Sequence, residues 1–363
     1  MTTKKLITLA AAAAVLGGLA YISSNSKKLK TPSQVGKPVL KALDLSEVQR
    51  IEVSDNGQKS LILAGTDAGW AVVSLFNYPA DITKIREHLF ALRDLKIGQV
   101  ATGKALGDAL VVDLQSASGK SLATLRLGDK HWREATGQMA MYGGGAYPDG
   151  RYVATESDAV YLVAETLDAF DGDPKRWVDT QLTSISAAHV VTAEYTVGGE
   201  TLMLEKKDGA WTLEGLGEQE ELDTSKMFGI DSALGFLHFS AIADPALTDD
   251  ELGMTTGTVY KVTLQSGESY TATIGSAVGA DRYFRISADF TPIANDVETM
   301  GDTAHLQQAQ QDLHNKLRTA AVEAFNAKAA NWTYLIPSHS TNNMSKRRAD
   351  IVKAKEAPQP EEE

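Results

Sequence analysis

The chain has 363 residues, 43% of them hydrophobic and 23% charged, so it is long enough for two ordinary domains and too apolar to be generally disordered. It contains no cysteine, which excludes disulfides, thiolate catalysis and cysteine-ligated metals. The formal net charge is −12, and residues 1–30 hold five lysines and no acid, so the remainder is still more acidic and would repel nucleic acid.

An apolar run at residues 6–22 has lysines on both sides, and its length is at the short end of a membrane span. An uncleaved signal anchor is the leading interpretation. A secretory signal peptide cut after Gly18-Leu19-Ala20 is a second, and a soluble helix is a third. The very short N-terminal tail favours a cytoplasmic N-terminus, with the body outside the inner membrane.

The first half of the chain predicts an antiparallel sheet with one helix. Asn56-Gly57 predicts a tight hairpin between two apolar strands, because both residues tolerate positive φ. Trp70 begins a third strand and is expected in the core. A helix is predicted after Asp81, and strands are predicted at 110–114, 122–127 and 160–163.

The second half repeats this order of elements. Trp211 follows Trp70 at an offset of 141 residues, about one domain length, and is also expected in the core. Turns are predicted at 197–199 and 207–209. A helix is expected from Leu222-Asp223-Thr224, with Met227, Ile230, Leu234 and Leu237 facing the core.

These patterns predict an α+β fold with two tandem copies of an antiparallel-sheet-plus-helix unit. The copies follow an N-terminal transmembrane or signal segment, and a long helix near 303–330 comes after them. The expected division is a signal anchor and flank (1–30), a tether (31–45), a first α+β repeat (46–170), a joint (171–187), a second α+β repeat (188–300), a C-terminal helix and short strand (301–345), and a disordered charged tail (346–363).

No motif predicts catalysis, a cofactor or a metal. Gly119-Lys120-Ser121 lacks the earlier glycine and the following helix of a phosphate-binding loop, so a hairpin turn is predicted. The seven histidines are scattered without an i, i+4 pair. Asp168, Asp171 and Asp173 lack the spacing of a calcium loop and are interpreted as a solvated turn.

The segment 131–150 is the most unusual connection in the chain. It is long for a loop inside a compact sheet, and the second copy has only a short turn at the same place. Aromatic residues and arginines are enriched at interface hot spots. The candidate partner-contact residues are therefore Trp132, Arg133, Tyr142, Tyr147 and Arg151, with a self-packed loop as the alternative.

Several motifs, taken in their order along the chain, resemble those of a known family. They include Trp70-Ala71-Val72, Leu127-Gly128-Asp129-Lys130-His131, residues 148–153 (Pro-Asp-Gly-Arg-Tyr-Val) and residues 332–337 (Trp-Thr-Tyr-Leu-Ile-Pro). Together they resemble the domain-of-unknown-function family 4340 over most of the chain after the anchor. The resemblance implies a bacterial single-anchor envelope protein associated with gliding-motility-type ABC transporters. It implies no catalytic residues.

The sequence and the resemblance together predict a non-enzymatic envelope protein anchored in the bacterial inner membrane through residues 6–22, with its body in the periplasm. Its predicted role is that of an accessory or binding subunit of an ABC-type transport system, with an ABC transporter or other envelope proteins as partners. The alternative is an extracytoplasmic hydrolase or a small-ligand carrier. Its site would lie at the repeat junction or under the loop 131–150.

Overall fold

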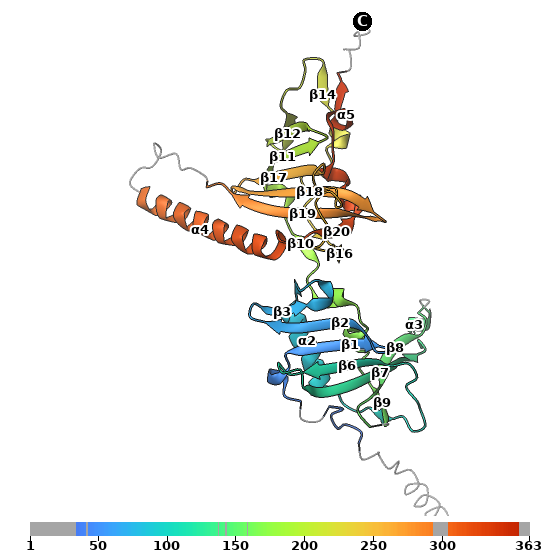
Figure 1. Cartoon of the computed structure of the whole chain (residues 1–363). Coiled ribbons are helices and arrows are strands. Elements are labelled where there is room, and N and C mark those ends of the chain that lie inside the picture. The colour runs from blue at the N-terminus through green and yellow to red at the C-terminus, as the bar shows by residue number, and fades with distance from the viewer. Residues whose placement is uncertain are drawn as a thin grey trace, which may run out of the picture. The chain divides into compact units, whose positions relative to one another are not determined.

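The computed structural model describes residues 34–40, 43–136, 138–141, 144–157, 159–292 and 304–355 (Figure 1). The apolar run at residues 6–22, expected to be the anchor, lies outside them. Within the described part of the chain, no helix has both the length and the apolar character that crossing a bilayer requires.

The described residues group into two compact units that do not follow chain order. Unit 1 contains the described residues of Met1–Asp67 together with Ile82–Asp173. Unit 2 contains Ala68–Asp81 together with the described residues of Pro174–Glu363. A short segment from the first half of the sequence therefore belongs to the unit built mainly from the second half.

The first sheet has nine strands in the order β4-β3-β2-β1-β6-β7-β8-β9-β5. Its hairpin β1–β2 turns at Asn56-Gly57, and both residues have positive φ as predicted. The strands are β1 (Arg50–Asp55), β2 (Gln58–Thr66), β3 (Gly69–Val72), β4 (Tyr78–Pro79), β5 (Gln99–Val100), β6 (Leu110–Gln115), β7 (Ser121–Arg133), β8 (Tyr147–Ala154) and β9 (Val160–Val163).

The second sheet has eight strands in the order β13-β12-β11-β17-β18-β19-β20-β16. This order matches β3-β2-β1-β6-β7-β8-β9-β5 strand for strand, so both sheets have the same topology. The strands are β11 (Val190–Val197), β12 (Glu200–Lys207), β13 (Ala210–Leu213), β16 (Ala241–Ile242), β17 (Thr258–Leu264), β18 (Glu268–Val278), β19 (Asp281–Phe290) and β20 (Tyr334–Pro337). The prediction of a mostly antiparallel α+β fold is confirmed.

The correspondence also covers a segment that comes before each sheet. In unit 1, Pro38 pairs with Lys96 although residues 31–45 were expected to be a tether. In unit 2, β10 (Gln181–Thr183) pairs with β15 (Leu237–His238) at the equivalent place. The ordered part of the first copy therefore begins before its first long strand.

Each copy carries an insertion that the other lacks. Residues 134–146 separate β7 from β8 and contain the short helix α3 (Gln138–Met141), whereas β18 and β19 are joined by a two-residue turn at 279–280. Between β19 and β20, residues 291–333 contain the helix α4 (Ala304–Ala329), whereas only 155–159 separate β8 from β9. In Figure 1, α4 lies beside β19 in unit 2.

The helix expected in both copies forms in only one. In unit 1 it is α2 (Ile82–Asp94), which buries Ile85, Leu89 and Leu92. In unit 2 only a 3₁₀ turn, η6 (Thr224–Lys226), forms, followed by further turns. The prediction of an α-helix there was wrong, because Gly229 has φ +82° and a second glycine follows at 235. The burial of Met227, Ile230, Leu234 and Leu237 was predicted correctly.

Two other expectations are corrected. Trp70 and Trp211 are only half-buried, and the fully buried tryptophan is Trp177. Part of the expected disordered tail is ordered, since α5 (Arg348–Ile351) leads into β21 (Val352–Ala354), which pairs with β14 (Glu220–Leu222). The buried side chain of Ile351 holds this segment in place, because removing it would expose apolar area to water.

Candidate functional site

The predicted contact residues of the 131–150 loop lie in different environments. Tyr142 lies outside the described residues. Trp132 is 58% exposed near the end of β7, and the Arg133 side chain beside it is also exposed. The half-buried Tyr147 pairs with Arg133 across the β7–β8 ladder. These three residues therefore cluster at one end of that ladder.

Arg151 is instead buried within unit 1. Its Nε donates to the Gly128 carbonyl at 2.9 Å, and its Nη1 donates to the Thr166 carbonyl at 3.3 Å. Nη1 also lies 2.5 Å from Asp171 Oδ1. With only 6% of Arg151 exposed, its guanidinium is used inside the fold and is not presented to a partner.

Two of the three aspartates that were interpreted as a solvated turn form ion pairs with a lysine. The Lys130 Nζ atom lies 2.6 Å from Asp168 Oδ1 and 2.9 Å from Asp171 Oδ2. Hydrogen bonds to these two carboxylates raise the pKa of Lys130, so an ammonium group is stabilised between them. Among the described residues, no three His, Asp or Glu side chains are arranged to hold a metal ion.

A second ion cluster joins the two ends of the 131–150 segment. Asp149 Oδ1 is 2.5 Å from His131 Nδ1, and Asp149 Oδ2 is 2.7 Å from Arg133 Nε. The hydrogen bond from His131, with the charge of Arg133, holds the pKa of the Asp149 carboxyl below its usual range. Asp149 is therefore an ionised partner of two side chains.

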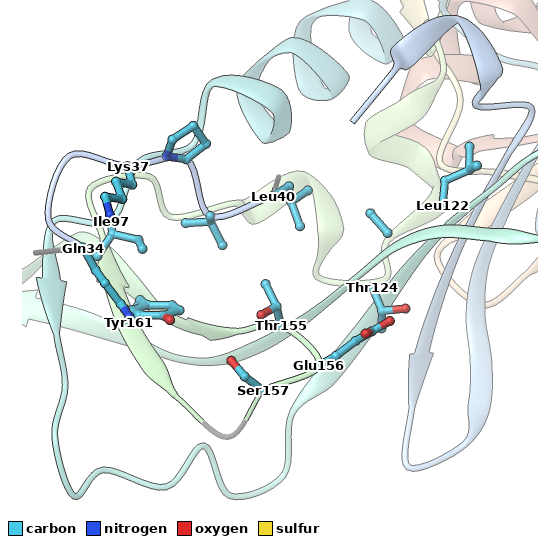
Figure 2. A pocket seen from close by; sticks show the side chains of 13 residues that line it. Gln34, Lys37, Leu40, Ile97, Leu122, Thr124, Thr155, Glu156, Ser157 and Tyr161 are labelled. Atoms are coloured by element: carbon cyan, nitrogen blue, oxygen red, sulfur yellow. The ribbon is translucent and has the colours of Figure 1, made fainter. Parts of the chain in front are cut away.

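A hollow of about 480 Å³ opens in unit 1, away from these clusters. We call it the β7 groove, and Figure 2 shows Leu40 on one wall with Thr155, Glu156 and Ser157 on the opposite wall. Its apolar lining residues are Pro38, Val39, Leu40, Ile97, Leu122 and Ala123. Its polar lining residues are Gln34, Lys37, Thr124, Thr155, Glu156, Ser157 and Tyr161. The volume is within the range of small-ligand and peptide sites.

Backbone hydrogen bonds fix the walls of the β7 groove. The Gly36 amide donates to the Ile97 carbonyl at 2.8 Å, and the Val39 amide donates to the Leu95 carbonyl at 2.9 Å. The opposite wall follows β8, and its Ser157 carbonyl accepts a hydrogen bond from Arg126 at 3.3 Å. The groove is therefore built on paired backbone on one side and on a restrained turn on the other.

The equivalent place in unit 2 is filled. Leu127 pairs with Val153, and Ile274 pairs with Phe284 at the same position of the second sheet. Counting back along both strands, Ala123 of β7 corresponds to Tyr270 of β18. The Tyr270 residue pairs with Ala288 of β19, and its ring packs against Phe325 of α4 with 5.2 Å between centroids.

In unit 1, β8 ends at Ala154, before it reaches Ala123. The β7 groove therefore occupies the space that unit 2 fills with the end of β19 and with α4. Sequence reasoning missed this site, although two signals were present. The connection 155–159 is much shorter than 291–333, and the small residue Ala123 stands where the second copy has a tyrosine.

Comparisons with known proteins find one relationship. The family model described as "Domain of unknown function (DUF4340)" matches residues 70–256. No curated protein and no solved structure matches the chain. Because the family model covers just over half of the chain, this protein belongs to the DUF4340 family.

Proposed function

We propose that this protein is a non-enzymatic, membrane-anchored envelope protein that serves as an accessory or binding subunit of an ABC-type transport system. Residues 6–22 would hold it in the bacterial inner membrane, with units 1 and 2 in the periplasm. The lysines on both sides of that run support anchoring, and the resemblance of the motifs supports the transporter association.

The observation that carries a binding role is the β7 groove. Two copies of one topology differ at this place, since unit 2 fills it with its own chain and unit 1 leaves it open. An open, partly apolar hollow on an otherwise duplicated scaffold is typical of a binding site. The carboxylates near the 131–150 loop are engaged in ion pairs, which supports a structural role for them.

Membrane placement can be tested in intact cells. Spheroplasts of a bacterium producing the full chain would be treated with protease before and after lysis. We expect the body to be degraded in intact spheroplasts, and we expect the protein to remain in the membrane pellet with residues 1–20 still attached. Protection from the protease would overturn the periplasmic placement, and loss of residues 1–20 would replace anchoring with secretion.

The partner can be tested in the same cells with a photo-crosslinking amino acid. Ser157 lies exposed on the wall of the β7 groove, and the exposed Ser118 in the β6–β7 turn is the matched control. We expect crosslinks from position 157 to a subunit of an ABC transporter, and none from position 118. Crosslinks to no transport component from position 157 would count against the accessory role.

A small-ligand carrier is the second candidate, because the volume of the β7 groove also suits a small molecule. A ligand that binds only the folded chain raises its unfolding temperature in proportion to the logarithm of ligand concentration. A screen of small polar and amphipathic metabolites by thermal unfolding would detect it. A concentration-dependent increase that Ala123→Arg abolishes would favour this candidate over a protein partner.

A further inference from the structure

We infer that the β7 groove binds an extended peptide segment of a partner protein, which adds to the sheet of unit 1 as a strand antiparallel to residues 121–125 of β7. The inference rests on the proposed binding role of unit 1 and names the chemistry of the partner.

One edge of β7 is free at residues 121–125. Residues 121–127 of β7 pair with β6 on one side, but on the other side the ladder with β8 begins only at Arg126 and Ala154. Among the described residues, no strand pairs with that second edge at 121–125. In an antiparallel sheet every other residue directs its N–H and C=O toward a given neighbour, so about two or three residues here offer backbone bonds to a new strand.

The composition of this edge suits strand addition. Sheet edges that must stay unpaired usually carry charged residues or proline, which discourage further strands. Residues 121–125 read Ser-Leu-Ala-Thr-Leu and contain neither. Leu122, Ala123 and Thr124 are half-buried and line the β7 groove, so a strand entering it would also bury apolar side chains.

The corresponding edge of β18 in unit 2 is occupied by a strand. There the ladder β18–β19 continues through Tyr270↔Ala288 to Glu268↔Phe290, so the same edge carries an antiparallel strand. The pairing residues 286–290 read Ile-Ser-Ala-Asp-Phe, and Ile286 and Ala288 are buried. The chain thus contains an example of what this edge accepts: an extended segment with apolar side chains at every second position.

The Ala123 position explains why unit 1 needs a partner to fill the site. In unit 2 the Tyr270 ring fills much of the space itself and meets Phe325 of α4. The methyl group of Ala123 leaves that volume open, and the described residues between β8 and β9 of unit 1 form no helix. A bound segment would therefore supply both the missing strand and the missing apolar side chains.

The test uses the full chain in detergent micelles and a synthetic peptide of residues 286–291, Ile-Ser-Ala-Asp-Phe-Thr, with a fluorescent label. The same peptide with Ala288→Pro is the control, because proline lacks the N–H and disrupts strand pairing. Binding is followed by fluorescence anisotropy, and its location is followed by hydrogen–deuterium exchange of β7.

We expect saturable binding of the peptide and at least tenfold weaker binding of its proline variant. Exchange at 121–125 should slow when the peptide is bound. In the protein, Ala123→Arg places a long charged side chain in the β7 groove and should weaken binding roughly tenfold or more. Ala140→Arg makes the same chemical change at an exposed position of unit 1 and should leave binding within about twofold.

Several results would overturn the inference. One is the absence of saturable peptide binding up to about 1 mM, where specific recognition becomes very weak. Another is slower hydrogen exchange outside residues 121–125 when the peptide is bound. A third is equal affinity of the peptide for the unsubstituted protein and for Ala123→Arg. Protection of all five amides in the free full chain would mean that the chain itself occupies the edge, which also overturns it. If Ala123→Arg fails to fold, exchange in the unsubstituted chain still decides. Crosslinking from position 157 combined with a failed peptide test would refute strand addition and leave the proposed function standing.

Discussion

At the scale of single residues, Arg151 shows how a side chain that looked like a contact residue became part of the interior. Its three acceptors come from residues 128, 166 and 171, which lie on separate segments of unit 1. Removing the guanidinium would take this donor from two carbonyls and would leave the Asp171 carboxylate with Lys130 alone. Stability, and not binding, is therefore the property that this residue controls.

We predict that Arg151→Met destabilises the protein by about 1–3 kcal/mol, because the Gly128 and Thr166 carbonyls lose a buried donor, while Asp171 keeps its ion pair with Lys130. Urea unfolding measures the loss. Arg133→Met is the matched control, since the exposed Arg133 side chain makes a surface pair worth about 0–1 kcal/mol. Equal effects from the two substitutions would refute the buried role of Arg151.

Glu268 gives a prediction about pH. Burial of this carboxyl favours a higher pKa, but hydrogen bonds from Ser266 and Arg318 outweigh burial, and the pKa is lower than usual in the folded state. A lowered pKa stabilises the fold above the unfolded value near 4.5, and this contribution is lost as the pH falls through the folded pKa. Arg318 belongs to α4, so the pair links α4 to β18.

Glu268→Gln should therefore be less stable than the unsubstituted protein at pH 7, and the difference should shrink as the pH falls below 4.5. Urea unfolding at several pH values, followed by circular dichroism, measures this convergence. Arg318→Met should also destabilise the protein at pH 7, because it leaves the buried carboxylate without its cation. Parallel stability curves for Glu268→Gln and the unsubstituted protein would contradict the assignment.

At the scale of elements, the hairpins were the most predictable part of the fold. Asn56-Gly57 and Asp208-Gly209 both adopt positive φ, and such turns are encoded by the two residues themselves. The helix expected near 222–237 failed for the opposite reason. Its apolar spacing correctly indicated which side chains are buried, but Gly229 and Gly235 disfavour a continuous helix there, because glycine loses more backbone entropy than other residues when it is fixed in a helix.

The short connection 155–159 and the small residue Ala123 were visible in the sequence, but they indicate the β7 groove only once the strand pairing over long distances is known. Residues 121–125 look like any other strand in the sequence. The structure shows that one edge of β7 is open because β8 ends early, at Ala154. It shows that the same edge is closed in unit 2 because the ladder there continues to Phe290. The candidate residues Trp132, Arg133 and Tyr147 remain predictions, on a surface separate from the groove.

The close approach of β8 and β9 at Gly150 gives an element-scale prediction. A side-chain carbon there would lie closer to the Val163 carbonyl than such atoms approach, so the backbone would have to shift. Gly150→Ala should destabilise the protein by about 1–3 kcal/mol. Gly145→Ala is the control, because nothing lies within 4 Å of its added carbon. Thermal unfolding compares them, and two equal midpoints would show that the ladder adjusts without strain.

At the scale of the whole molecule, unit 2 includes a segment from the first half of the sequence. Residues 68–81 precede α2 of unit 1 in the chain but belong to unit 2. Within this segment, Tyr78 is 2% exposed and packs with three aromatic rings of unit 2. Its centroid lies 5.4 Å from Phe239, 5.1 Å from Trp332 and 6.2 Å from Tyr334.

We predict that Tyr78→Ala destabilises unit 2, although its position in the sequence falls in the first repeat. Removing a large buried aromatic side chain costs about 3–5 kcal/mol. Hydrogen–deuterium exchange should therefore accelerate around the ring's neighbours Phe239, Trp332 and Tyr334, while β1 and β6 of unit 1 keep their protection. Ile85→Ala in α2 is the reciprocal variant, because its buried side chain belongs to unit 1. Faster exchange in β1 and β6 of Tyr78→Ala would instead mean that the repeats unfold along sequence boundaries. Residues 68–81 would then contribute nothing to the stability of unit 2.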